Sequence, residues 1–213
     1  PGPAQSDTAF AAVMTLAEHH LIQRSQDSAG TTRLTLLDTI REYVWEQVRV
    51  HHEDDAVARL HADYAIALAE RAGPHLWGPD QRAWAERLDA DYPNLVLALN
   101  WAIPHWPEGG LRLATRLFRY WSVRGMLSEG RRYLAWALEV VPPTDRDLYA
   151  KALNGAGLLA FRQGDFEQAN LWLMECLDHL RVLGEPRGLG SVLNNLALVA
   201  LEQNRYADAQ RFH

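Results

Sequence analysis

Two asparagines 40 positions apart, Asn154 and Asn194, have the type and spacing of ligand-binding residues. Each follows by one residue a leucine of an amphipathic helical pattern, so the two amides are expected at equivalent positions of similar helices. An amide both donates and accepts hydrogen bonds, which suits it to the polar groups of a bound molecule. The same face is expected to carry six further residues: Arg112, Arg119, Leu158, Phe161, Arg162 and Leu198. This mixture suggests an amphipathic or acidic partner, and an ordinary solvated helix surface is the open alternative.

Three polar residues near the N-terminus, Gln23, Arg24 and Arg33, could contact the phosphates of DNA. Nucleic-acid binding depends on many phosphate contacts, and two arginines supply few of them. The helix expected before them, residues 7–20, contains no Arg or Lys to read base edges in the major groove. Packing against protein is therefore the favoured role of this segment, and DNA binding is kept as an alternative.

Residues 51–55 and His61 offer nitrogen and oxygen ligands for a metal ion. Their spacing matches no zinc pattern, and adjacent side chains on a helix diverge, so no metal site is predicted. A phosphate-binding loop of the GxxxxGK[ST] type does not occur, and no Ser-His-Asp arrangement has a supporting motif. The sequence therefore predicts neither a bound cofactor nor catalysis.

Helical hairpins are the elements that must position the two asparagines. Residues 150–177 have apolar side chains at helical spacing on both sides of Gly164 and Asp165, which suit a left-handed turn and a helix cap. The small residues Gly157 and Ala169 are expected where the two helices cross closely. Leucine at either position is expected to cost about 1–3 kcal/mol of stability by overpacking.

The hairpin pattern recurs along the chain. Asn204, which tolerates left-handed geometry, and Ala209 repeat the turn glycine and the small alanine after 40 positions, and Ala197 repeats the small glycine. A weaker copy lies 39 positions earlier. Three such copies resemble tetratricopeptide (TPR) repeats, whose first helices line a concave ligand-binding surface. That resemblance implies that the two asparagines hold the backbone of a ligand.

The N-terminal part is expected to fold as helix, hairpin and helix. Residues 7–20 have a helical pattern with Asp7 or Thr8 as the cap, and two short segments, 21–24 and 34–36, read as paired strands. A second helix follows. This order resembles the C-terminal part of a winged-helix domain.

The wording of residues 34–48, LTLLDTIREYVWEQV, and of residues 81–102 makes the resemblance sharper. These segments look like the winged helix and the linker helices that follow the nucleotide-binding module of bacterial STAND-type signalling ATPases. That family includes the AfsR-related and the large LuxR-type transcriptional regulators. By this resemblance, Pro93 stands in the first turn of a linker helix. The implied fold is mostly α: a partial winged helix with a small β-hairpin, followed by an α-α superhelix of TPR-like hairpins.

The resemblance implies a non-catalytic sensor. A protein, peptide or small effector on the concave face would act through the winged helix on the upstream nucleotide-binding domain of the same chain. ATP or ADP and Mg²⁺ are then expected only in that upstream module, because the chain reads as a piece of a longer regulator. Two alternatives stay open: a DNA-binding winged helix with a TPR dimerisation arm, and a plain TPR adaptor. The implied domains are the winged helix (1–52), linker helices (53–107) and repeats (108–213, divided as 108–144, 145–184 and 185–213).

Composition agrees with a regulator that does not bind nucleic acid through this segment. The formal net charge of −6 lacks the positive footprint of a nucleic-acid binder. No run of 18 apolar residues occurs, so no membrane span is predicted. The single cysteine, Cys176, excludes an internal disulfide, is expected to be a small buried side chain, and fits a cytoplasmic location.

Overall fold

The computed structural model describes residues 3–26, 32–50, 54–184 and 186–212. It is mostly α-helical, with one small β-hairpin among the described residues and a series of helical hairpins, so the predicted fold class is confirmed. The chain divides into two compact units, Pro1–Val57 and Ala58–His213. The predicted domain boundaries stay predictions.

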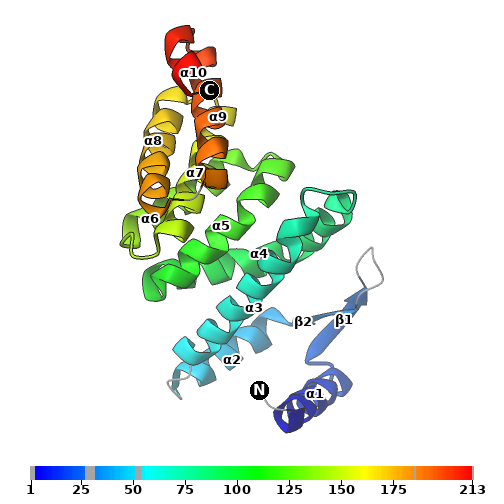
Figure 1. Ribbon diagram of the computed structural model, residues 1–213. Helices are drawn as coiled ribbons and strands as arrows, with labels where there is room; N and C mark the ends of the chain where they lie inside the picture. The colour runs from blue at the N-terminus through cyan, green and yellow to red at the C-terminus, as the bar shows by residue number, and fades with distance from the viewer. Residues whose placement is uncertain (1–2, 27–31, 51–53, 185, 213) are drawn as a thin grey trace. The chain divides into compact units, whose positions relative to one another are not determined.

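The first unit has the expected order of helix, hairpin and helix (Figure 1). Its elements are α1 (Pro3–Glu18), β1 (Ile22–Gln26), β2 (Thr32–Leu36) and α2 (Asp38–Val50). The prediction that Asp7 or Thr8 caps the first helix is wrong, because α1 already begins at Pro3, and proline suits a first helical turn. Both strands are longer than the segments predicted for them. They pair antiparallel, with Ile22 opposite Leu36 and Gln26 opposite Thr32.

Helical hairpins form the second unit and follow one another along it (Figure 1). Its helices are α3 (Asp54–His75, which starts at the boundary), α4 (Gln81–His105), α5 (Pro107–Arg124), α6 (Leu127–Val140), α7 (Arg146–Arg162), α8 (Phe166–Leu183), α9 (Pro186–Glu202) and α10 (Tyr206–Phe212). The pairs α5/α6, α7/α8 and α9/α10 correspond to the three copies seen in the sequence. Their inward faces form a continuous core of Leu, Ala and aromatic side chains.

Helix α4 differs from the sequence-based expectation. Pro93 was expected in the first turn of a helix, but it lies inside the 25-residue helix α4, so that expectation is wrong. An internal proline removes one backbone hydrogen bond and costs about 3 kcal/mol or more. Leu88, Leu95 and Ala98 are at most 1% exposed on either side of it. Their burial offsets the cost and keeps the helix continuous.

Left-handed residues make the turns between paired helices. Gly125 and Gly164 have φ values of +71° and +77°, and Asn204, which takes this role in the last pair, has φ +58°. Asp165 then begins α8 by accepting a hydrogen bond from the backbone N–H of Gln168 at 3.2 Å. The local turn chemistry is therefore the one that the sequence predicts.

The α7–α8 pair crosses at small residues. A Cβ atom on Gly157 would lie 2.8 Å from Cγ of Leu173, closer than carbon atoms pack. Ala169 on α8 is fully buried, and Ala197 and Ala209 are 1% and 3% exposed in the next pair. Small side chains therefore stand where the helices approach each other.

Cys176 is buried between helices α7 and α8. Its Sγ donates a hydrogen bond to the carbonyl oxygen of Ala150 at 3.1 Å, and burial raises the pKa of the thiol to about 12. Only the thiolate reacts with disulfide reagents. We therefore expect almost no labelling of the folded protein by Ellman's reagent at pH 8, and one thiol per chain after unfolding in guanidinium chloride. Rapid stoichiometric labelling of the folded chain would contradict this placement.

Candidate functional site

One face of α7 lines pockets along the second unit. This face consists of residues three or four positions apart on the helix: Asp147, Lys151, Asn154, Leu158 and Arg162. Three pockets formed by described residues share it, and the opposite walls come from α5, α9 and the α3–α4 loop. Most of the residues that the sequence assigned to a binding face line one of these three pockets.

The pocket between α5, α7 and the α3–α4 loop, named here the arginine pocket, has a volume of about 490 Å³. It is lined by Trp77, Gln81, Phe118, Arg119, Ser122, Val123, Leu158 and Arg162. It combines aromatic, aliphatic and cationic side chains, and its volume is in the range of small-molecule sites. Three of the predicted residues, Arg119, Leu158 and Arg162, meet in it.

The carbonyl oxygen of Leu76, just after α3, fixes one wall of the arginine pocket. It accepts hydrogen bonds from Nε2 of Gln81 at 2.7 Å and from Nε of Arg119 at 3.2 Å. The guanidinium of Arg119 also stacks on the indole of Trp77, 3.9 Å from the ring centre. The Trp77 ring lies 6.5 Å from that of Phe118 and is 65% exposed. A flat aromatic surface is thus held beside a cation and left accessible.

Arg162 enters the same pocket from α7. It donates hydrogen bonds to the carbonyl and hydroxyl oxygens of Ser122 on α5, and Ser122 is buried. Burial, and then repulsion from Arg162, lowers the pKa of Arg119. Arginine nevertheless stays protonated at neutral pH, because its ordinary pKa is above 12. Two positive charges therefore lie in the lining of one pocket, close enough to repel each other.

Arg119 and Arg162 differ from many other arginines of the chain in their ion pairing. Among the described residues, no ion pair includes Arg119 or Arg162, whereas several other arginines of the second unit pair with carboxylates. Each guanidinium carries five N–H donors, and the contacts above use only some of them. The remaining donors suit an oxyanion, which arginine binds in a bidentate geometry.

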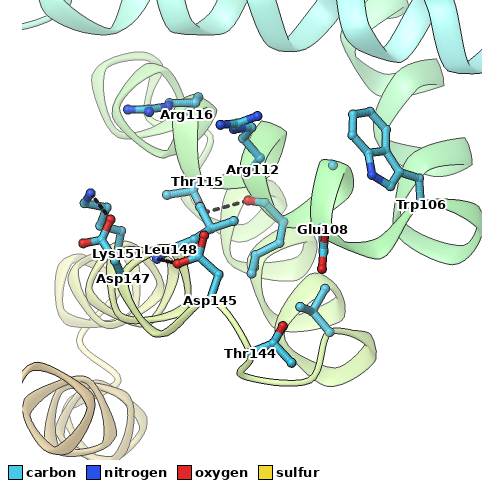
Figure 2. Close-up of a pocket in the computed structure, with 13 residues that line it drawn as sticks. Trp106, Glu108, Arg112, Thr115, Arg116, Thr144, Asp145, Asp147, Leu148 and Lys151 are labelled. Carbon is cyan, nitrogen blue, oxygen red and sulfur yellow. Dashed lines mark hydrogen bonds and ion pairs between the residues drawn. The ribbon is translucent and has the colours of Figure 1, made fainter. Parts of the chain in front are cut away.

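The pocket between the starts of α5 and α7 is lined by both acidic and basic side chains (Figure 2). Arg112 and Arg116 pair with Glu70 of α3 at 3.4 and 3.7 Å. Lys151 pairs with Asp147, as Figure 2 shows. The predicted residue Arg112 therefore lines a pocket, but it already has a carboxylate partner. This site does not require a charged ligand.

The two predicted asparagines do not line a common pocket among the three described above. Asn154 lines a pocket of about 350 Å³ between α7, α8 and α9, and its Oδ1 accepts a hydrogen bond from Nδ2 of Asn195 at 2.9 Å. Asn194 is exposed and lines none of the three pockets. One position on a helix rotates a side chain by about 100°, so an equivalence read from sequence can miss the facing residue by one. Whether Asn154 binds a ligand stays a prediction.

The remaining predicted residues lie outside these pockets. The Phe161 ring packs against Phe166 at 5.8 Å, and Leu198 is 41% exposed on α9. Conversely, the sequence analysis missed Trp77, Gln81 and Phe118. Trp77 and Gln81 lie at the α3–α4 connection, where helical periodicity carries no signal. The only sequence signal that could have identified Phe118 as a pocket residue is its position next to Arg119 on an amphipathic helix.

The hairpin residues proposed for DNA contact are divided between its two faces. Directly paired residues share a face, so Arg24 lies with Leu34, whereas Arg33 lies with Ser25 on the other side. Gln23, one residue before Arg24, shares the face of Arg33. The hairpin therefore presents no concentrated basic surface, which lowers the support for DNA binding.

The described parts of the chain contain neither a metal-binding cluster nor a membrane-spanning helix. His51, His52 and Glu53 lie outside the described residues. Within the described ranges no group of three or more His, Cys, Asp or Glu side chains could hold a metal ion. Of the helices in those ranges, none combines the length and apolar character that a bilayer crossing needs.

Comparisons with known proteins point to transcriptional regulators. Relatives from Mycobacterium bovis and Mycobacterium tuberculosis, each named "Putative HTH-type transcriptional regulator", are 36% identical over 114 residues. The match covers 53% of this chain but only 12% of each relative's length. No protein-family model matches the sequence.

A solved structure supports the fold. The crystal structure of BtubC (BKLC) from P. vanneervenii aligns with a TM-score of 0.52 and 17% identity, over 73% of this chain and 70% of that one. At this identity the likeness shows the fold alone. By sequence, the chain is similar to one part of much longer proteins named as HTH-type transcriptional regulators.

Proposed function

We propose that this chain is a non-catalytic sensor arm of a transcriptional regulator. The observation that carries the proposal is the 36% identity to relatives with that name, over more than half of the chain. The pocket-lined face of α7 supports it, because successive first helices of TPR-like repeats form a binding surface. As in STAND-type regulators, an upstream nucleotide-binding module with ATP or ADP and Mg²⁺ would complete the protein, which would act in the cytoplasm.

Regulation would follow from a difference in affinity. An effector that binds the pocket-lined face of α7 more tightly in one state of the regulator shifts the equilibrium toward that state. Coupling of this kind typically amounts to about 1–3 kcal/mol, or roughly 5–150-fold in affinity. The proposed effector is a protein, a peptide or a small molecule.

Deletion of α5–α10 from the complete gene tests the sensor role. We expect output from a reporter placed behind the regulated promoter to change at least about fivefold. Immunoblotting checks that the shortened protein accumulates to the normal level. Unchanged output at equal abundance would reject the proposal.

Binding measurements on the 213-residue chain separate the competing functions. We expect calorimetry to detect no ATP binding and fluorescence anisotropy to detect no duplex DNA binding. Salt-sensitive DNA binding that disappears in Arg24→Ala and Arg33→Ala variants would support the DNA-binding alternative instead. A plain adaptor would bind a partner protein without any change in promoter output.

A further inference from the structure

The arginine pocket concentrates positive charge in a chain of negative net charge. The chain has 27 acidic and 21 Lys or Arg residues, yet Arg119 and Arg162 have no carboxylate partner among the described residues. In the neighbouring pocket, by contrast, Arg112 and Arg116 share Glu70. Two cations in one pocket repel each other, and binding of an anion between them relieves that repulsion.

The other walls of the pocket indicate what the anion carries. The Trp77 ring is exposed beside Arg119, and Phe118, Val123 and Leu158 add apolar surface. A purely inorganic anion would leave this apolar surface exposed to water. A ligand with an aromatic or aliphatic body would cover it and gain the free energy of apolar burial.

We propose that the arginine pocket binds a small organic oxyanion, whose carboxylate or phosphate group lies between Arg119 and Arg162 and whose apolar or aromatic body lies against Trp77 and Phe118. The volume of about 490 Å³ favours a small molecule over a long peptide. Ser122 and the Leu76 carbonyl hold the two guanidinium groups in place before binding. This inference rests on the proposed sensor function, for which it names the class of effector.

The first experiment titrates the 213-residue chain with four probes: phenyl phosphate, phenylacetate, inorganic phosphate and neutral benzyl alcohol. Binding is followed by calorimetry and by the ¹⁵N–¹H signal of the Trp77 indole, which a Trp77→Ala variant identifies. We expect at least one aromatic anion to bind more tightly than inorganic phosphate, benzyl alcohol not to bind, and added salt to weaken binding.

Variants assign the binding to the pocket. Arg119→Gln and Arg162→Gln should each weaken binding of the aromatic anion about tenfold or more, because each removes a charge-assisted interaction. Arg116→Gln is the matched control on the same helix and should change affinity less than about twofold, since Arg116 lies outside the arginine pocket and pairs with Glu70. Trp77→Ala should erase the preference for aromatic anions.

Three results would overturn the proposal. The first is the absence of any saturable signal with either aromatic anion. The second is binding that Arg119→Gln and Arg162→Gln leave intact, and the third is equal affinity for inorganic and phenyl phosphate, which would indicate an adventitious ion only. An acidic peptide that binds more tightly than every small anion, through the same arginines, would replace the small-molecule ligand.

The reporter assay separates this inference from the proposed function. If deleting α5–α10 changes promoter output but the double variant Arg119→Gln/Arg162→Gln does not, the sensor role stands and the arginine pocket is excluded as its site. If the double variant abolishes probe binding while the deletion leaves output unchanged, the pocket stands and the sensor role fails.

Discussion

Replacement of Gly157 by leucine is expected to lower the free energy of unfolding by about 3 kcal/mol. A single Cβ at this position already lies 2.8 Å from Cγ and 3.0 Å from Cδ2 of Leu173. Leucine adds three further carbons at a crossing where Ala169 leaves no space either. The α7–α8 pair must then separate, and the loss is measured as a shift in the urea unfolding midpoint by circular dichroism.

Gly190→Ala is the matched control for that substitution. Gly190 lies inside α9, and a Cβ atom there would meet nothing within 4 Å. Alanine in a helix interior is favoured over glycine by about 0.5–1 kcal/mol, so this variant should be slightly more stable. If Gly157→Leu unfolded at the same urea concentration as the natural protein, the close crossing would be refuted.

Local chemistry explains what the sequence could predict of the fold. The turn residues Gly125, Gly164 and Asn204 act through their own backbone angles, and Asp165 caps a helix three residues away. Such signals need no knowledge of distant contacts. They sufficed to locate the helical hairpins and their repeat.

Distant contacts explain what the sequence missed. The arginine pair forms because α5 and α7 bring together residues 43 positions apart, and Trp77 joins from an interhelical connection. Pro93 was misplaced because burial on both sides of it outweighed its local preference. Residue type alone also cannot show that Arg112 pairs with Glu70 while Arg119 stays without an acidic partner among the described residues.

Residue type alone does not show which tryptophans are buried. The largest loss of stability is expected from replacing a buried one, Trp121. Trp121 on α5 is fully buried, and its indole N–H donates a hydrogen bond to the Tyr92 hydroxyl on α4 at 3.0 Å. Its ring stacks on Tyr133 of α6, with centroids 5.9 Å apart and planes inclined by 9°. One side chain therefore joins three helices. Trp77 is also a tryptophan beside helical segments, yet it is mostly exposed.

We expect Trp121→Ala to cost about 3–5 kcal/mol in the free energy of unfolding, because it removes a large buried side chain and leaves a cavity. Trp121→Phe keeps most of the stacking but leaves the Tyr92 hydroxyl without its donor, so it should cost about 1–3 kcal/mol. Trp77→Ala should cost less than about 1 kcal/mol while removing the aromatic preference of the arginine pocket. Urea unfolding of the three variants measures these differences. Equal midpoints for Trp121→Ala and Trp77→Ala would show that α4, α5 and α6 are not joined through this ring, and the wall that carries Arg119 would then need a different support.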